Sequence, residues 1–385
     1  MRKWLLPEYL EDILPPEAQN IELVRRALLD LFHGHGYELV MPPLLEYVES
    51  LLTGTGRDMD LATFKLVDQL SGRQIGIRAD ITPQVARIDA HLLNRKGVTR
   101  LCYAGNVLHT LPSGIAQSRE PLKIGAELYG HAGIESDIEI QRLMLEALRM
   151  SGVKGVTLDL GHVGIFRALA KQASISAEHE GEMFRVLLAK DVPSLRELTQ
   201  PLPAISRDAL RALPELYGGM DILDAAHKRL PALPEISSAL NDLKSLAQKL
   251  TGNVEHISFD LAELRGYHYH SGVVFAAYAP GYADAIARGG RYDQVGKAFG
   301  RSRPATGFDM DLRELARQYP MKNNARGILA PYSDDEKLFN IINKLRNSGE
   351  IVKIALPGSN DHRAELDCDR EIAQVNGAWQ VTNIS

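Results

Sequence analysis

The chain has 385 residues, of which 45% are hydrophobic and 24% are charged. Such values are typical of a globular protein with two or three domains, and they exclude a mainly disordered chain. The 44 basic and 49 acidic side chains give a net charge of −5, so the overall charge does not predict a nucleic-acid partner.

The two cysteines, Cys102 and Cys368, are too far apart in the sequence to form a CxxC metal pair, and they fit a reducing compartment best. Pro7 and the acids that follow it interrupt the apolar stretch that a signal peptide would need. Nowhere does the sequence hold about 18 consecutive apolar residues, so no membrane span is predicted. We therefore expect a cytoplasmic protein.

The N-terminal half alternates helical and extended patterns. Apolar side chains at Ile21, Val24 and Leu28 have the spacing of one helical face, and two nearby glycines favour its end. In chain order we expect a helix over residues 17–36, a strand over 37–41, a helix over 44–52, a hairpin of residues 64–68 and 74–78, a helix from Asp80 or Thr82, and two strands within residues 99–130.

The second half begins with helix-forming runs that prolines interrupt, between about residues 160 and 250, which indicates an inserted helical domain. The elements expected after it are strands over residues 257–261 and 271–278, a turn at Gly289-Gly290, a helix over 308–319, and a β-α-β unit of residues 327–330, 334–346 and 351–356.

Two segments carry polar side chains that could form a site. One lies at the junction of a strand and a helix, and the other lies on a strand. Asp80 and Thr82 lie between a strand and a helix, where they could receive an ammonium group or simply cap the helix. On a strand, Lys123, Gly125 and Glu127 share one face, which could be the floor of a site or an exposed ion pair.

Two further segments combine glycines with polar side chains. The segment 264–272 reads as a strand with alternating faces, namely Arg265, Tyr267 and Tyr269 on one side and Gly266, His268 and His270 on the other. His268 and His270 could hold a metal, but no third ligand lies near them in the sequence, and sheet packing explains the pattern equally well. The glycines at 289 and 290 could cradle an anion or form a plain hairpin turn.

Taken in order, these passages resemble the catalytic core of histidyl-tRNA synthetase, a class II aminoacyl-tRNA synthetase. The resemblance covers about residues 5–318 and rests on Ile77-Arg78-Ala79-Asp80-Ile81-Thr82, Gly125-Ala126-Glu127-Leu128-Tyr129-Gly130, Arg265-Gly266-Tyr267-His268-Tyr269-His270-Ser271-Gly272, Gly289-Gly290-Arg291-Tyr292-Asp293 and Gly307-Phe308. It implies an α+β fold with an antiparallel sheet flanked by helices, and a dimer. The division expected from it is a synthetase-like core of residues 1–160 and 251–320, a helical insertion of residues 161–250 and a small C-terminal α/β domain of residues 325–385.

At the positions that match the ATP-binding residues of the synthetases, the chain differs from the family. His109 and Leu111 stand where the synthetases have an arginine and a glutamate that hold ATP, and Glu314 stands where they have the arginine that clamps it. Asp311 replaces a nearby glycine. Loss of one preorganised donor commonly lowers the rate about 10²–10³-fold, so adenylation is not expected.

More residues are retained at the positions that match the histidine-binding site of the synthetases. It implies that Asp80 and Thr82 meet a histidine ammonium, Glu127 meets the imidazole and Arg265 meets the carboxylate, whereas Lys123 and His270 replace a Gln and a Tyr. The implied histidine-binding set is Asp80, Thr82, Glu127, Arg265, Tyr269 and His270. The resemblance implies no catalytic residue, metal or cofactor.

Only 60 residues follow residue 325, without a basic face, where a synthetase would carry an anticodon-binding domain of about 100. This pattern resembles the regulatory subunits of ATP phosphoribosyltransferase, synthetase-like proteins of histidine biosynthesis. Their partners would be the short catalytic subunit, a second copy of the chain and histidine as effector, with no nucleic acid or membrane. An active synthetase and a free-standing histidine-binding protein are the alternatives.

Overall fold

The structure is a computed structural model, which describes residues 4–53, 57–112, 118–267, 269–319, 326–358 and 365–384. The chain divides into two compact units, Met1–Tyr319 and Pro320–Ser385. In the described residues no helix is long and apolar enough to cross a membrane.

The first unit is built on a nine-stranded sheet with the strand order β1-β5-β6-β12-β11-β10-β7-β9-β8. Its strands are β1 (Glu38–Leu39), β5 (Thr99–Asn106), β6 (Leu122–Tyr129), β7 (Thr157–His162), β8 (Tyr217–Gly218), β9 (His256–Asp260), β10 (Val273–Tyr278), β11 (Ala287–Arg291) and β12 (Ala305–Asp311). Neighbouring strands are antiparallel except for β1 with β5 and β7 with β9. The expected antiparallel sheet flanked by helices is thus confirmed.

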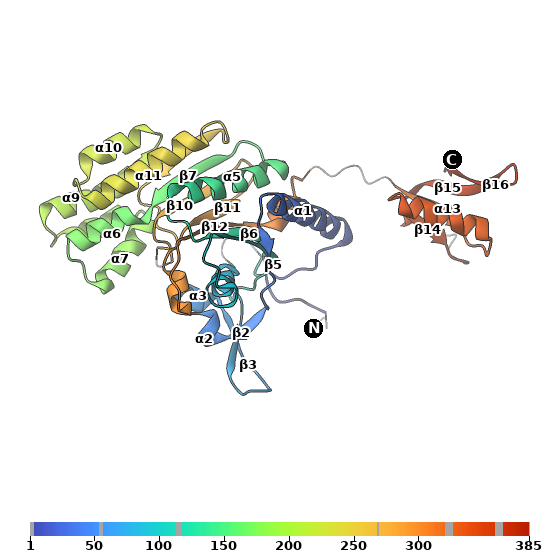
Figure 1. Ribbon diagram of the computed structural model, residues 1–385, viewed down its shortest axis with the longest axis horizontal. Coiled ribbons are helices and arrows are strands. Elements are labelled where there is room, and N and C mark those ends of the chain that lie inside the picture. Colours follow the sequence, from blue (N-terminus) through green and yellow to red (C-terminus); the bar gives the residue numbers. More distant parts are fainter. Residues whose placement is uncertain are drawn as a thin grey trace. The chain divides into compact units, whose positions relative to one another are not determined.

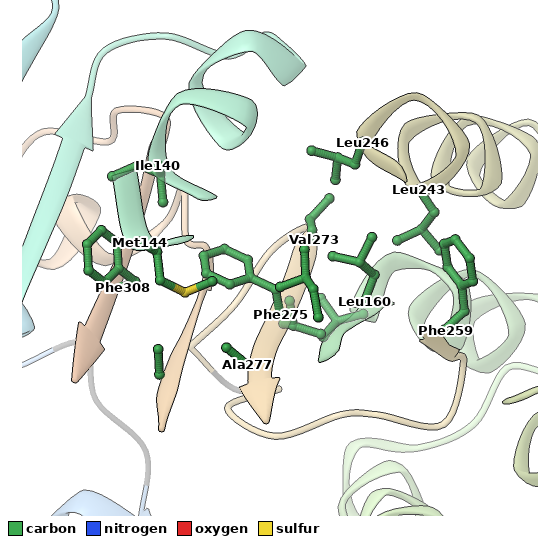
Figure 2. Packing of buried hydrophobic residues seen from close by; sticks show 14 of the residues in the cluster. Ile140, Met144, Leu160, Leu243, Leu246, Phe259, Val273, Phe275, Ala277 and Phe308 are labelled. Atoms are coloured by element: carbon green, nitrogen blue, oxygen red, sulfur yellow. The ribbon is translucent and has the colours of Figure 1, made fainter. Parts of the chain in front are cut away.

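One face of this sheet is covered by helices α1 (Pro15–Gly34), α5 (Ile134–Met150) and α11 (Pro234–Leu250). Figure 2 shows Met144 of α5 lying against Phe308 and Phe275, and Leu243 of α11 lying near Phe259. Val274, Phe275 and Ala276 of β10 line a cavity, and of these Val274 and Phe275 also belong to this core. The sheet therefore connects the core with a candidate site.

The helices after β7 gather beside this core, in the green and yellow part of Figure 1. They are α6 (Val163–Gln172), α7 (Ala177–Leu188), α8 (Val192–Thr199), α9 (Ala204–Ala212), α10 (Asp221–Arg229) and α11, with a short 3₁₀ helix, η2 (Leu213–Glu215), before β8. Pro234 begins α11, where a proline needs no hydrogen-bonded N–H, and the side chain of Ser176 caps α7 by accepting from the His179 N–H.

A smaller three-stranded sheet, of order β2-β4-β3, lies in the N-terminal part of the unit. The remaining elements of this unit are β2 (Leu45–Tyr47), α2 (Val48–Leu51), α3 (Arg57–Ala62), β3 (Phe64–Val67), β4 (Gln74–Ile77), α4 (Thr82–Arg87), the π-helical turn η1 (Ile88–Leu93), the 3₁₀ helix η3 (Val295–Phe299) and α12 (Leu312–Ala316). The expected hairpin is β3-β4, and the helix expected from Asp80 or Thr82 starts at Thr82.

One expectation about local structure was wrong, and two were confirmed only in part. Gly289 and Gly290 lie inside β11, between β10 and β12, rather than in a turn. A Cβ at Gly289 would come within 2.5 Å of the Phe275 ring, so a glycine is required there by close packing and not by a turn. The helix expected over residues 308–319 is found only at Leu312–Ala316, because residues 308–311 belong to β12 and pair with β6. The helix expected over residues 44–52 is found only at Val48–Leu51, because Leu45–Tyr47 pairs with β4 as a strand.

The second unit is a four-stranded sheet of order β14-β13-β15-β16 with helix α13. Its elements are β13 (Gly327–Pro331), α13 (Glu336–Asn347), β14 (Val352–Ala355), β15 (Cys368–Val375) and β16 (Ala378–Asn383). The parallel pair β13 and β14 with α13 between them is the β-α-β unit expected from the sequence. Its core includes Ile328, Leu338 and Ile372.

Candidate functional site

A cavity of about 310 Å³, called here the main cavity, lies on the sheet face opposite α5 and α11. All six residues of the set expected from the sequence line it, namely Asp80, Thr82, Glu127, Arg265, Tyr269 and His270. They come from the start of α4, from β6 and from the segment before β10. The fold therefore brings together residues that are up to 190 positions apart in the sequence.

Asp80 and Thr82 serve the helix and the cavity at once. The Asp80 carboxylate accepts a hydrogen bond from the Thr82 N–H at 3.1 Å, and the Thr82 hydroxyl lies 3.2 Å from the Tyr103 hydroxyl. Burial, together with the nearby Asp309 carboxylate, raises the pKa of Asp80. Because a positive charge would relieve both effects, this corner of the cavity favours an ammonium group.

Glu127 is the buried acid at the centre of the main cavity, with 1% of its surface exposed. It accepts hydrogen bonds from Tyr103, at 3.2 Å, and from Tyr292, whose hydroxyl also lies 3.1 Å from that of Tyr129. Burial raises the pKa of Glu127 to about 8, although the hydrogen bonds from Tyr292 and Thr82 act against this shift. The group is therefore mostly protonated at pH 7, and a polar ring can exchange hydrogen bonds with it.

Two glycines make room for this acid and its partners. A Cβ at Gly125, next but one to Glu127 on β6, would come within 2.5 Å of the Tyr103 hydroxyl, and a Cβ at Gly307 would overlap the Glu127 carboxylate. Gly125 thus leaves room for the Tyr103 ring beside Glu127. The alternative of an exposed Lys–Glu pair is wrong, because Glu127 is buried and Lys123 pairs with Asp309 on β12.

Arg265 lies at the rim of the main cavity, and 49% of its side chain is exposed. Its guanidinium lies 3.8 Å from Glu263 and donates to the Tyr278 hydroxyl at 3.3 Å. A half-exposed guanidinium with one long ion pair retains donors for a carboxylate, since the guanidinium carries five N–H groups.

Tyr269 and His270 form an aromatic wall, and the segment that holds them is a turn rather than the expected strand. The Tyr269 ring packs on Tyr292 with centroids 4.8 Å apart, and its buried hydroxyl has no hydrogen-bond partner within the described residues. The His270 ring fits against Gly266 and Gly290, where a Cβ would come within 2.6 and 2.7 Å of ring atoms. Burial lowers the pKa of His270 to about 4, so the imidazole is neutral at pH 7.

His268 lies outside the described residues, so the metal alternative for His268 and His270 has no geometry here. Among the residues that the structure does describe, no three His, Cys, Asp or Glu side chains are grouped to hold a metal ion.

Tyr103 and Tyr292 are site residues that the sequence analysis missed. Tyr292 belongs to the Gly289–Asp293 passage, and Tyr103 stands opposite Gly125 in the pairing of β5 with β6. The alternation of small and large residues across two paired strands is the only signal that could have found Tyr103.

A second cavity of about 160 Å³ lies beside the first, at the place where the resemblance would put ATP. Every lysine and arginine that lines it is already paired with a carboxylate. The pairs are Lys123 with Asp309, Arg288 with Asp284, Arg313 with Glu17 and Glu11, and Arg317 with Glu314. Cations that are neutralised in this way attract a triphosphate less strongly than unpaired ones would, so this cavity is poorly suited to ATP.

Three of the four replacements noted in the sequence line this cavity, namely His109, Asp311 and Glu314. The His109 ring lies 2.9 Å from the Ala79 carbonyl oxygen, and Leu111 is 75% exposed. Glu314 and Arg313 of α12 both line the second cavity, and Arg313 is also bonded to Glu17 of α1. An acid therefore lines this cavity at the position where the resemblance expects the arginine that clamps ATP.

Two family models match the chain. The model described as histidyl-tRNA synthetase matches residues 9–315, and the model described as ATP phosphoribosyltransferase subunit HisZ C-terminal domain matches residues 325–382.

Curated relatives match over nearly the whole chain. One from Ralstonia pickettii (strain 12J) is 60% identical over 98% of this chain and 97% of the relative, and one from Burkholderia cenocepacia (strain HI2424) is 58% identical over 99% of each. Both are named ATP phosphoribosyltransferase regulatory subunit.

Two solved structures are similar to this chain over most of its length. A protein of Bacillus halodurans C, described as an ATP phosphoribosyltransferase regulatory subunit/histidyl-tRNA synthetase, is 27% identical with a TM-score of 0.83, covering 94% of this chain and 96% of that one. A histidyl-tRNA synthetase from Nostoc sp. PCC 7120 is 15% identical with a TM-score of 0.76, covering 97% and 92%, and so shares the fold.

Proposed function

Because the chain belongs to the family of ATP phosphoribosyltransferase regulatory subunits, we propose that it is the non-catalytic regulatory subunit of that enzyme, which catalyses the first step of histidine biosynthesis. In this role it activates the short catalytic subunit and mediates feedback inhibition by histidine. The observation that carries the proposal is the contrast between the two cavities. The main cavity keeps an acid, a hydroxyl and an arginine for an amino acid, whereas the cations of the second cavity are neutralised.

Histidine in the main cavity would place its ammonium at Asp80 and Thr82 and its carboxylate at Arg265. Its imidazole would meet Glu127, with Tyr269 and His270 as the surrounding wall. Support comes from the buried acid and from the unpartnered Tyr269 hydroxyl, which a polar ligand can satisfy. An analogue that lacks the imidazole nitrogens would leave these buried groups unpaired, so it should bind much more weakly.

The mechanism of regulation would be linkage. Histidine binds one conformation of the assembly better than another, and a coupling of about 1–3 kcal/mol passes to the catalytic partner. We also propose a dimer of this chain within the larger hetero-oligomer, located in the cytoplasm, without nucleic-acid contact. Exposed apolar side chains such as Met41 (81%) and Leu70 (97%) support self-association or partner contact.

The proposed domain division keeps a core of residues 1–160 and 251–320, a helical insertion of residues 161–250 and a C-terminal domain of residues 325–385. It is supported by the position of α6 to α11 between β7 and β9 in the chain. Limited proteolysis of the purified chain, followed by mass spectrometry of the fragments, would test these boundaries.

The function is tested by adding the purified chain to a short catalytic ATP phosphoribosyltransferase subunit and measuring phosphoribosyl transfer to ATP. The proposal predicts a rate that rises with added chain until it saturates. A rate that stays the same with and without the chain would contradict it. Calorimetry with histidine tests the site separately: Arg265→Ala should weaken binding of histidine at least tenfold, because the carboxylate would lose its cation.

A further inference from the structure

Tyr267 packs against two of the helices that follow β7. It is 4% exposed. Its ring is stacked on Phe184 of α7 with centroids 5.5 Å apart and meets the edge of Phe166 of α6 at 5.2 Å. Its hydroxyl donates a hydrogen bond to the Glu180 carboxylate, also on α7. Both helices therefore hold this residue from different sides.

Arg167 of α6 holds the backbone of the same segment. One nitrogen of its guanidinium donates to the carbonyl oxygens of Tyr267 and of His270, each at 2.7 Å. The guanidinium also lies over the Tyr267 ring, 4.8 Å from its centroid. A single side chain thus connects the two ends of the turn that presents Tyr269 to the main cavity.

This matters because the segment is a turn and not a strand. A strand would owe its position to the sheet, through its ladder of backbone hydrogen bonds. The turn that carries Arg265 and Tyr269 is instead held on one side by α6 and α7, through the Tyr267 ring and Arg167. On its other side, Tyr269 packs on Tyr292 and His270 lies against Gly290. Arg265 and His270, which line the main cavity, lie within three residues of Tyr267. A shift of α7 that moved Phe184 or Glu180 would therefore move the cavity wall.

We propose that Tyr267 and Arg167 are positioning residues for the effector, and that α6 and α7 set the affinity of the main cavity through them. This inference rests on the proposed function, because the effector it concerns is the histidine of that site. Tyr267 itself lines the main cavity, but its hydroxyl is bonded to Glu180, so neither residue needs to bond to histidine. They hold Arg265, Tyr269 and His270 in the geometry that binds it, so that displacement of α7 and release of histidine favour each other.

The experiment is histidine calorimetry on the full-length chain with variants that leave the rings in place. Tyr267→Phe removes the hydrogen bond to Glu180 and should weaken histidine binding about tenfold, whereas Glu180→Gln removes only the charge of the acceptor and should weaken binding by a smaller factor. Glu178→Gln removes the same charge from an exposed position of α7 and should leave the affinity as in the wild type. Thermal unfolding of each variant separates positioning from folding: the melting temperature of Glu180→Gln should stay within a few degrees of the wild type.

Arg167 supplies a second, independent measurement. Arg167→Met should weaken histidine binding more than Tyr267→Phe, and Arg167→Lys should recover part of the loss, because a lysine can still donate to one carbonyl. Histidine affinities equal to the wild type in Tyr267→Phe, Glu180→Gln and Arg167→Met would overturn the inference while leaving the proposed function intact. A wild-type chain that binds no histidine would overturn the proposed site itself, and with it the positioning role.

Discussion

Replacement of Glu127 by glutamine gives the sharpest physical prediction about the main cavity. In the unfolded chain the carboxyl has the ordinary pKa of 4.5, whereas burial in the folded protein raises its pKa to about 8. Between these two values the folded state binds more protons than the unfolded state. The contribution of Glu127 to stability is therefore fully present below pH 4.5 and is lost as the pH rises through 8.

The magnitude follows from the difference between the two pKa values. About 3.5 pH units at 1.36 kcal/mol each correspond to roughly 5 kcal/mol at most, and about 3 kcal/mol is a reasonable expectation once the cavity relaxes. A glutamine keeps the shape and the hydrogen bonds of the protonated acid toward Tyr103 and Tyr292. Glu127→Gln should therefore match the wild type at pH 4.5 and exceed its free energy of unfolding by about 3 kcal/mol at pH 8.5.

The assay is urea unfolding followed by far-ultraviolet circular dichroism at a series of pH values between 4.5 and 8.5. Glu139→Gln is a suitable control, because a hydrogen bond from Arg100 lowers the pKa of Glu139, which is thus ionised in both states above about pH 6. Its difference from the wild type should stay constant from pH 6 to 8.5. A Glu127→Gln difference that is equally constant would refute the assignment of a raised pKa to this buried acid.

Three further outcomes follow from the same geometry. Gly307→Ala should abolish histidine binding, measured by calorimetry, because the added Cβ overlaps the Glu127 carboxylate; a wild-type affinity would show that the acid is not part of the site. Arg291→Met should lower the free energy of unfolding by about 3–5 kcal/mol in a urea titration, since Asp137, 2.6 Å from the guanidinium, would remain buried without its partner; a loss below 1 kcal/mol would contradict this. The purified chain should give no histidine-dependent exchange between ATP and pyrophosphate, and robust exchange would mean that the paired cations of the second cavity can still serve a nucleotide.

Sequence patterns predicted the helices and the main-cavity residues better than the strands around them. Helices α1 and α11 were predictable because their buried side chains recur at helical spacing over many turns. The strand β11 was not, because Gly289 and Gly290 are typical turn residues. Side chains are excluded there by the rings of Phe275 and His270 and by the backbone of neighbouring strands, which meet these glycines only in the folded chain.

The candidate site was also predictable from the sequence only in part. The residues expected to bind histidine follow from an ordered set of motifs, and the fold brings them into one cavity. Tyr103 and the ion pair of Arg313 with Glu17 could not be predicted, because each depends on elements that are distant in the sequence and meet only in the folded chain. The hydrogen bonds by which Arg167 of α6 supports the cavity wall could not be predicted either, because they form only when distant parts of the chain pack together.

The most direct test of the account is inhibition of the reconstituted enzyme by histidine, with either the wild-type chain or Glu127→Ala added to the short catalytic subunit. Initial rates of phosphoribosyl transfer would be measured over a range of histidine concentrations. We expect both chains to activate the catalytic subunit equally, and only the complex with the wild-type chain to lose activity as histidine is added. Inhibition of both complexes at the same histidine concentration would contradict the claim that the effector acts from the main cavity.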